Sequence, residues 1–153
     1  MILHLNKKNK PTIVDISQKN QTTRIAKAEG IIQFSKNTFK KIESLKTKKG
    51  EIKNTSIIAG ILGAKKTSEI IPLCHNIKIE NIDINIRLNN NKNLIIVTCL
   101  VKSFGKTGVE MEALTGVAVT CLTIYDMCKS IDRKINIKEI KLLEKKGGKS
   151  DLS

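Results

Sequence analysis

Two pairs of charged residues lie in a long, mostly apolar stretch near the end of the chain, where packing alone gives charges no role. Glu110 and Glu112 follow a turn framed by glycines at 105 and 108, and Asp126 and Lys129 lie at the far end. An acid and a lysine spaced i, i+3 share one face of a helix. Partial burial of such a pair shifts its pKa values and suits proton transfer. We therefore expect acid–base chemistry from Asp126 and Lys129, although an exposed ion pair would have the same spacing.

The turn and the two acids before this helix are open to more than one interpretation. Acidic side chains in a first helical turn complement the helix dipole, and residues spaced i, i+2 point in different directions. We therefore expect only one of Glu110 and Glu112 to face a ligand. The turn around Lys106 resembles half of a phosphate loop, but position 100 lacks the glycine that a nucleotide triphosphatase needs. Such a turn can still bind an anion, or it can simply connect a strand to a helix.

The cysteines and His75 argue against a metal centre. A single histidine such as His75 is more often structural than catalytic. Cys121 and Cys128 are seven residues apart, which places them about 10.5 Å apart along a helix, too far to share a zinc ion. None of the four cysteines forms a C-x-x-C pair. Reduced thiols, and hence a cytoplasmic location, are the expected state.

The spacing of the two charged ends has a further consequence. Glu112 and Asp126 are 14 residues apart, or about 21 Å along an unbroken helix. One compact site in one subunit cannot easily contain both. Either the ligand is long, or sites form between subunits, and we favour a shared site in a homo-oligomer.

Apolar periodicity predicts the elements that position these residues. Isoleucines alternate with polar residues in the segment 77–88, and the chain returns as a second strand over 94–101 after an asparagine-rich turn. Antiparallel strands with helices packed on one face give an α+β fold, which we expect to be ferredoxin-like. The remaining elements are expected as strands at 12–17, 23–34 and 135–143, and as helices at 35–45, 55–71 and 109–130.

Composition restricts the class of protein. The chain has 153 residues, and we expect a flexible basic tail at 1–11 and a single catalytic domain at 12–153. No segment reaches the roughly 18 unbroken apolar residues of a membrane span. The net charge is +14, but 25 of the 28 basic residues are lysine, beside 25 isoleucines and 13 asparagines. This joint excess indicates compositional drift, and with so few aromatic residues we expect neither nucleic-acid nor membrane partners.

With these motifs in view, the chain resembles the MoaC family of molybdenum-cofactor biosynthesis, the cyclic pyranopterin monophosphate synthases. The resemblance covers nearly the whole chain from about residue 12. It implies a ferredoxin-like α+β fold, no metal or organic cofactor, and a homohexamer built as a trimer of dimers with active sites between subunits. The matching segments are 14–17, 49–51, 70–75, 105–115, 122–129 and 147–150.

The activity that the resemblance implies is that of a phosphorus–oxygen lyase. The substrate would be 3′,8-cyclo-7,8-dihydroguanosine 5′-triphosphate, the product of a radical S-adenosylmethionine enzyme. The products would be cyclic pyranopterin monophosphate and diphosphate. The family's catalytic residues correspond to Asp126, Lys129 and Lys49. Its substrate contacts correspond to Leu73, Cys74, His75, Met111 and Glu112, with Lys145 as a further candidate.

The residue chemistry agrees with this implication. A triphosphate requires cations, and a lysine near burial or another cation loses its proton more easily. We expect Lys49 and Lys129 to share the acid–base and phosphate roles, in an order that the sequence leaves open, while Asp126 orients a lysine or shuttles a proton.

The chain also departs from the family pattern. Asn76 stands where the family often has proline, Ile57 replaces a common arginine, and Ser150 is not followed by the usual glycine. The loss of that arginine removes a possible phosphate partner. Two other classes stay open: a small basic nucleic-acid-binding protein, and a silent relative acting in assembly. The intact catalytic candidates argue against the second of these.

Overall fold

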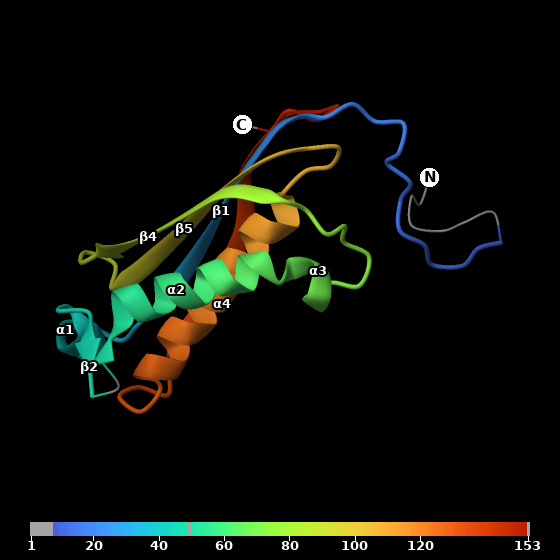
Figure 1. Cartoon of the computed structure of the whole chain (residues 1–153). Helices are drawn as coiled ribbons and strands as arrows, with labels where there is room; N and C mark the ends of the chain where they lie inside the picture. Colours follow the sequence, from blue (N-terminus) through green and yellow to red (C-terminus); the bar gives the residue numbers. More distant parts are fainter. Residues whose placement is uncertain (1–7, 49, 153) are drawn as a thin grey trace.

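The centre of the protein is a four-stranded antiparallel sheet in a computed structural model that describes residues 8–48 and 50–152 (Figure 1). The strand order is β4-β5-β1-β6. β1 and β4 both run antiparallel to β5, which lies between them, and β6 flanks β1 on its other side. With helices after β1 and after β5, this is the βαββαβ order of the predicted ferredoxin-like fold. The strands are β1 (Thr22–Gln33), β4 (Ile79–Asn89), β5 (Leu94–Gly105) and β6 (Asn136–Lys146).

The isoleucine alternation builds the inner face of the sheet. Ile84 and Ile86 on β4 are buried, as are alternate residues of β5 from Ile95 onward. The hairpin between them closes at Asn93, whose positive φ of 52° is one that asparagine tolerates. Both β5 and β6 are longer than predicted, since β1 pairs with them as far as Gly105 and Lys146.

Two helices cover one face of the sheet, as Figure 1 shows. They are α2 (Ile52–Lys65) and α4 (Glu110–Cys128), beside the shorter α1 (Lys36–Ile42) and α3 (Thr67–Ile70). The single helix predicted over 55–71 is two helices, because Lys66 leaves the helical conformation with φ −99° and ψ 9°. The basic turn before α2 is a small hairpin of β2 (Lys46–Thr47) and β3 (Gly50–Glu51). The predicted cap of α1 is confirmed, because Ser35 Oγ accepts a hydrogen bond from the Thr38 N–H at 3.3 Å.

Small residues bring the layers together. A Cβ on Gly30 of β1 would collide with Val117 and Cys121 of α4, and one on Gly60 of α2 would collide with Thr120 of α4. α4 is therefore pressed against both β1 and α2. By length and composition it could also cross a membrane, but more than half of it is buried inside this fold.

The strand predicted at 12–17 is wrong. Residues 12–16 have no regular secondary structure, and the chain then turns at 17–18. This segment is held by side chains at one end of the sheet and not by a strand ladder, as the contacts described below show.

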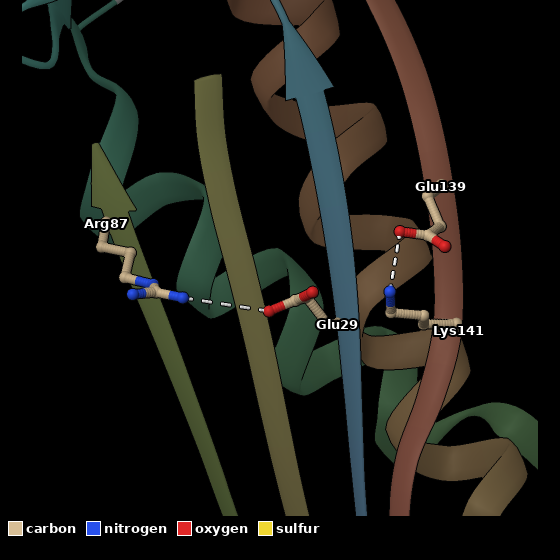
Figure 2. Close-up of polar contacts among 4 residues, drawn as sticks. All are labelled: Glu29, Arg87, Glu139 and Lys141. Atoms are coloured by element: carbon tan, nitrogen blue, oxygen red, sulfur yellow. Dashed lines mark hydrogen bonds and ion pairs between the residues drawn. The ribbon is translucent and has the colours of Figure 1, made fainter. Parts of the chain in front are cut away.

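The opposite face of the sheet carries ion pairs. Figure 2 shows the helices behind the sheet, with Arg87 of β4 reaching across β5 to Glu29 of β1 at 4.0 Å. Along β6, Lys141 Nζ lies 3.0 Å from a carboxylate oxygen of Glu139. In the first pair Arg87 is exposed and Glu29 is half-buried. Surface ion pairs stabilise a fold by about 1 kcal/mol at most.

Candidate active site

A basic cavity of about 950 Å³ opens where β1 begins, β6 ends and α4 begins. Figure 1 shows the C-terminal end of the chain lying beside the start of β1 at this place. A cavity of this size accommodates an ordinary small-molecule ligand. Convergent cations raise the local concentration of anions, so the cavity suits a polyphosphate. Its basic lining residues are Lys19, Arg24, Lys106, Lys145, Lys146 and Lys149.

Arg24 orders one wall of the basic cavity. Its Nε donates to the Gly105 carbonyl at 3.3 Å, and its Nη2 donates to the Lys106 carbonyl at 3.4 Å. These bonds fix the turn that precedes α4. The turn lines the cavity through Lys106, Thr107 and Gly108, so the helix N-terminus and its positive dipole end lie beside the lysines.

A smaller cavity of about 250 Å³ adjoins the basic one. The two share Lys19, Thr107, Gly108 and Glu110 as lining residues. The small cavity contains five of the predicted substrate contacts, and the sixth, Lys145, lines the basic cavity. The structure therefore brings all six into two adjoining cavities. The five in the small cavity are Leu73, Cys74, His75, Met111 and Glu112.

Glu112 is the most perturbed acid at this end of the helix. It is only 3% exposed, and burial, with a smaller contribution from the charge of Glu110, raises its pKa to about 7. A carboxyl group with such a pKa can exchange a proton near neutrality. Burial also raises the pKa of the neighbouring Cys74 thiol, with a further contribution from Glu112. Cys74 is therefore a neutral thiol at neutral pH.

Both first-turn acids line the small cavity. The expectation that only one of them faces a ligand stays a prediction. Glu110 Oε1 also lies 3.8 Å from Lys145 Nζ, at the junction of the two cavities. Glycine at position 108 leaves room for the Glu110 carboxylate, because a Cβ on residue 108 would collide with it.

The other end of α4 carries Asp126 and Lys129. Lys129 Nζ lies 2.6 Å from Asp126 Oδ1, and both side chains are more than half exposed. The expectation of a partly buried pair is therefore wrong within one subunit, because the pair lies on the outward side of the helix end. The hydrogen bond and charge of Asp126 raise the pKa of Lys129, which keeps the ammonium protonated.

A third cavity of about 450 Å³ lies at this distal end and is lined by the β2–β3 hairpin and the end of α4. Lys49 itself lies outside the described residues. Its neighbour Lys48 lines this cavity together with Thr47, Met127 and Ser130. Two groups of predicted residues thus lie at opposite ends of α4: the substrate contacts at the start, and Asp126, Lys129 and the hairpin at the end.

Five cations of the basic cavity were not predicted as site residues: Lys19, Arg24, Lys106, Lys146 and Lys149. Lys19 and Arg24 follow the matching segment 14–17 without belonging to it. Lys106 lies inside the matching segment 105–115 but was interpreted only as part of a turn. A usable signal existed for Arg24, one of only three arginines in a lysine-rich chain. Cys121 and Cys128 are buried in the core, away from the lining of either proximal cavity.

Comparison with known proteins places these features in one family. The MoaC family model matches residues 13–148. A protein of Helicobacter hepaticus named cyclic pyranopterin monophosphate synthase is 52% identical over 149 residues, covering 97% of this chain and 94% of its own. Proteins with the same name from Campylobacter jejuni strain RM1221 and Clostridium acetobutylicum are 50% and 46% identical over 147 residues. Both alignments cover 96% of this chain, with 94% and 91% of those relatives.

Proposed function

Because the chain belongs to the MoaC family, we infer that it is a cyclic pyranopterin monophosphate synthase, a lyase of molybdenum-cofactor biosynthesis. It converts 3′,8-cyclo-7,8-dihydroguanosine 5′-triphosphate to cyclic pyranopterin monophosphate and releases diphosphate. In this proposal residues 12–153 act as one catalytic domain.

The pair of adjoining cavities is the observation that carries this proposal. The basic cavity offers six cations for a triphosphate, and the small cavity beside it offers a buried acid, a histidine and a thiol for a heterocycle. A nucleoside triphosphate derivative has the same division into a polyanionic end and a hydrogen-bonding ring. We assign the ring to Leu73, Cys74, His75, Met111 and Glu112, and the phosphates to Lys145 and its basic neighbours.

Cyclisation of the phosphate sets the geometric demand on the basic cavity. A sugar hydroxyl must attack the α-phosphorus as the bond to diphosphate breaks, so both groups must be held in line. Cations at the β- and γ-phosphates stabilise the charge that develops on the departing diphosphate. Lys145 serves this purpose, and its ion pair with Glu110 opens to free the ammonium for phosphate.

Asp126, Lys129 and Lys49 are proposed as the catalytic residues. Because Asp126 raises the pKa of Lys129, Lys129 stays a protonated ammonium, which is suited to binding a phosphate in its present surroundings. Abstraction of a proton by Lys129 would need its pKa to be lowered by burial or by a further cation. In the proposed assembly a second subunit supplies both, because it buries the helix end and brings the cations of its basic cavity close to Lys129.

We propose that the two ends of α4 meet between subunits of a homo-oligomer, the trimer of dimers of the family. An exposed stripe along α4 supports this arrangement. Met111 is 38% exposed and Leu122 is 58% exposed, and the partly exposed Thr115, Ala118 and Tyr125 continue the same face. Two copies packed antiparallel along this stripe bring Lys129 of the partner subunit beside Met111, and form two equivalent sites.

Two of the three departures from the family pattern lie outside the linings of the two proximal cavities, whereas Ser150, which the usual glycine does not follow, lines the basic cavity. Ile57 packs against the core from α2, so its replacement of an arginine removes no cation from the basic cavity within a subunit. Asn76 is exposed and lines neither proximal cavity. Cys74, Cys99 and Cys121 are free thiols, which supports a cytoplasmic location for the enzyme.

A coupled assay tests the proposal. The purified protein is supplied with the cyclic dihydroguanosine triphosphate, and diphosphate release and pterin formation are followed together. We expect the wild-type protein to form both products in equal amounts, and folded Asp126→Ala to form neither. A folded wild type without turnover would refute the activity, and tight, salt-sensitive binding of RNA or DNA by that protein would favour the nucleic-acid-binding class.

A further inference from the structure

Residues 14–19, here called the cover segment, lie over both proximal cavities without forming a helix or strand. Val14 and Ile16 line the small cavity, and Asp15 and Gln18 line the basic cavity. Lys19 lines both. One short stretch of chain therefore faces the proposed ring site and the proposed phosphate site together.

Two side chains from the cavity walls fasten the cover segment. The Nε2 atom of His75 lies 2.7 Å from the Val14 carbonyl oxygen. Because a carbonyl oxygen only accepts, Nε2 carries the hydrogen and donates it, which leaves Nδ1 for a ligand. At the other end of the segment, Lys106 Nζ donates to the Ser17 carbonyl at 2.6 Å.

Between these two points the segment holds its own shape. The Ser17 N–H donates to Asp15 Oδ1 at 2.8 Å, and the Lys19 N–H donates to the Ile16 carbonyl at 3.1 Å. The segment is nonetheless weakly embedded, because residues 17–20 are exposed and the adjoining Ile13 is 48% exposed. Segments with little buried apolar surface open at low free-energy cost. The cover segment thus behaves as a preshaped piece whose position depends on its fastenings.

Lys106 differs from His75 because it faces the phosphate site. It lines the basic cavity, and Arg24 holds the turn that carries it. An ammonium group has three N–H donors. After one is given to Ser17, the others can meet an anion in the cavity. A phosphate bound there would hold Lys106 in place and, through it, the cover segment.

We propose that Lys106 is a positioning residue that couples occupation of the basic cavity by phosphate groups to closure of the cover segment over the small cavity. The identity of the phosphate ligand in this proposal rests on the proposed function. The test uses inorganic diphosphate and does not depend on that function. Closure places Val14 and Ile16 against the ring and excludes water from the small cavity. Phosphate binding thereby prepares the ring site for the chemistry.

Hydrogen exchange of residues 12–20 tests this coupling, with inorganic diphosphate as the probe. We expect saturating diphosphate to slow exchange about tenfold in the wild type, the scale of one charge-assisted hydrogen bond. In Lys106→Met, also saturated with diphosphate, exchange should not slow. Lys102→Met is the matched control, because it removes the same charge from an exposed position on β5 that lines neither cavity. Lys106→Arg keeps a long cation and should retain part of the protection.

Equal protection in Lys106→Met and the wild type, or no protection in the wild type, overturns the coupling. If Lys106→Met does not fold, Lys106→Gln and Lys106→Arg carry the comparison. Turnover is measured separately on the same proteins. Protection by diphosphate in a wild type that does not turn over substrate would refute the proposed function and leave the coupling intact.

Discussion

The two ends of α4 present opposite environments to the residues proposed for function. At the start of the helix, Glu112 is 3% exposed, its pKa is raised to about 7, and it lines a cavity formed by this subunit's own residues. At the other end, Asp126 and Lys129 form an ion pair with both side chains more than half exposed. Within one subunit, the start of the helix has the burial that shifts a side-chain pKa toward neutrality, and the other end does not.

This difference indicates which half of the site a single subunit completes. Burial and neighbouring charge are what shift a pKa toward neutrality. Glu112 has both within its own subunit, whereas Lys129 has only a carboxylate that raises its pKa. The proposed substrate-binding end is thus formed by the fold itself. In our proposal, the catalytic end acquires its working environment from a second subunit.

The largest expected effect comes from the exposed end. Asp126→Ala should lower turnover about a hundredfold or more, the scale of a lost acid–base or orienting group. The free energy of unfolding should change by less than about 1 kcal/mol, because an exposed pair contributes little. Steady-state diphosphate release and urea denaturation measure the two quantities.

Lys129→Ala should behave in the same way as Asp126→Ala. If either substitution unfolds the protein, the ion pair is needed for folding. The distinction between a structurally important start of α4 and a dispensable exposed end would then be wrong. Unimpaired turnover in Lys129→Ala would remove this residue from the mechanism.

A smaller effect is expected at the buried end, where Glu112 links stability to pH. Its folded-state pKa is about 7, above the usual 4.5. Between these values the folded state binds more protons than the unfolded state. The free energy of unfolding therefore falls by up to about 3 kcal/mol as pH rises through this window. Above the window, the Glu112 contribution no longer changes with pH.

Glu112→Gln is the matched variant, since it keeps the shape and removes the titration. Urea denaturation at pH 5 and pH 8, at one protein concentration, should show the wild type losing more stability than the variant. A similar loss in both proteins would mean that Glu112 is not the group responsible.

The smallest effect is expected on the far face of the sheet. Arg87→Met removes the ion pair to Glu29 shown in Figure 2, where the partners are 4.0 Å apart. Stability should change by no more than about 1 kcal/mol, and turnover should be unchanged. A marked loss of turnover in the same assays would mean that this face takes part in the active site. It would contradict the account that function is confined to the two ends of α4.

The sequence predicted what depends on periodicity and local chemistry. Alternating isoleucines predicted the β4–β5 hairpin, Ser35 predicted the start of α1, and the fold class followed from their order. The burial of Asp126 and Lys129 was predicted wrongly, because an apolar helix does not reveal which stripe stays uncovered in one subunit. The cover segment was taken for a strand, since hydrogen bonds from Lys106 and His75 to backbone carbonyls leave no periodic trace. Lys19 and Arg24 were missed because only the fold brings them beside Lys145.

Subunit mixing tests the central claim, that each site joins the two ends of α4 from different subunits. Asp126→Ala and His75→Ala are each inactive under this account, but carry their defects at opposite ends. After dissociation and reassembly of an equal mixture, one intact site forms in each mixed pair, and turnover should recover to about a quarter of the wild-type value. No recovery in reassembled mixtures, with mixed pairs demonstrated by mass spectrometry, would contradict the shared site.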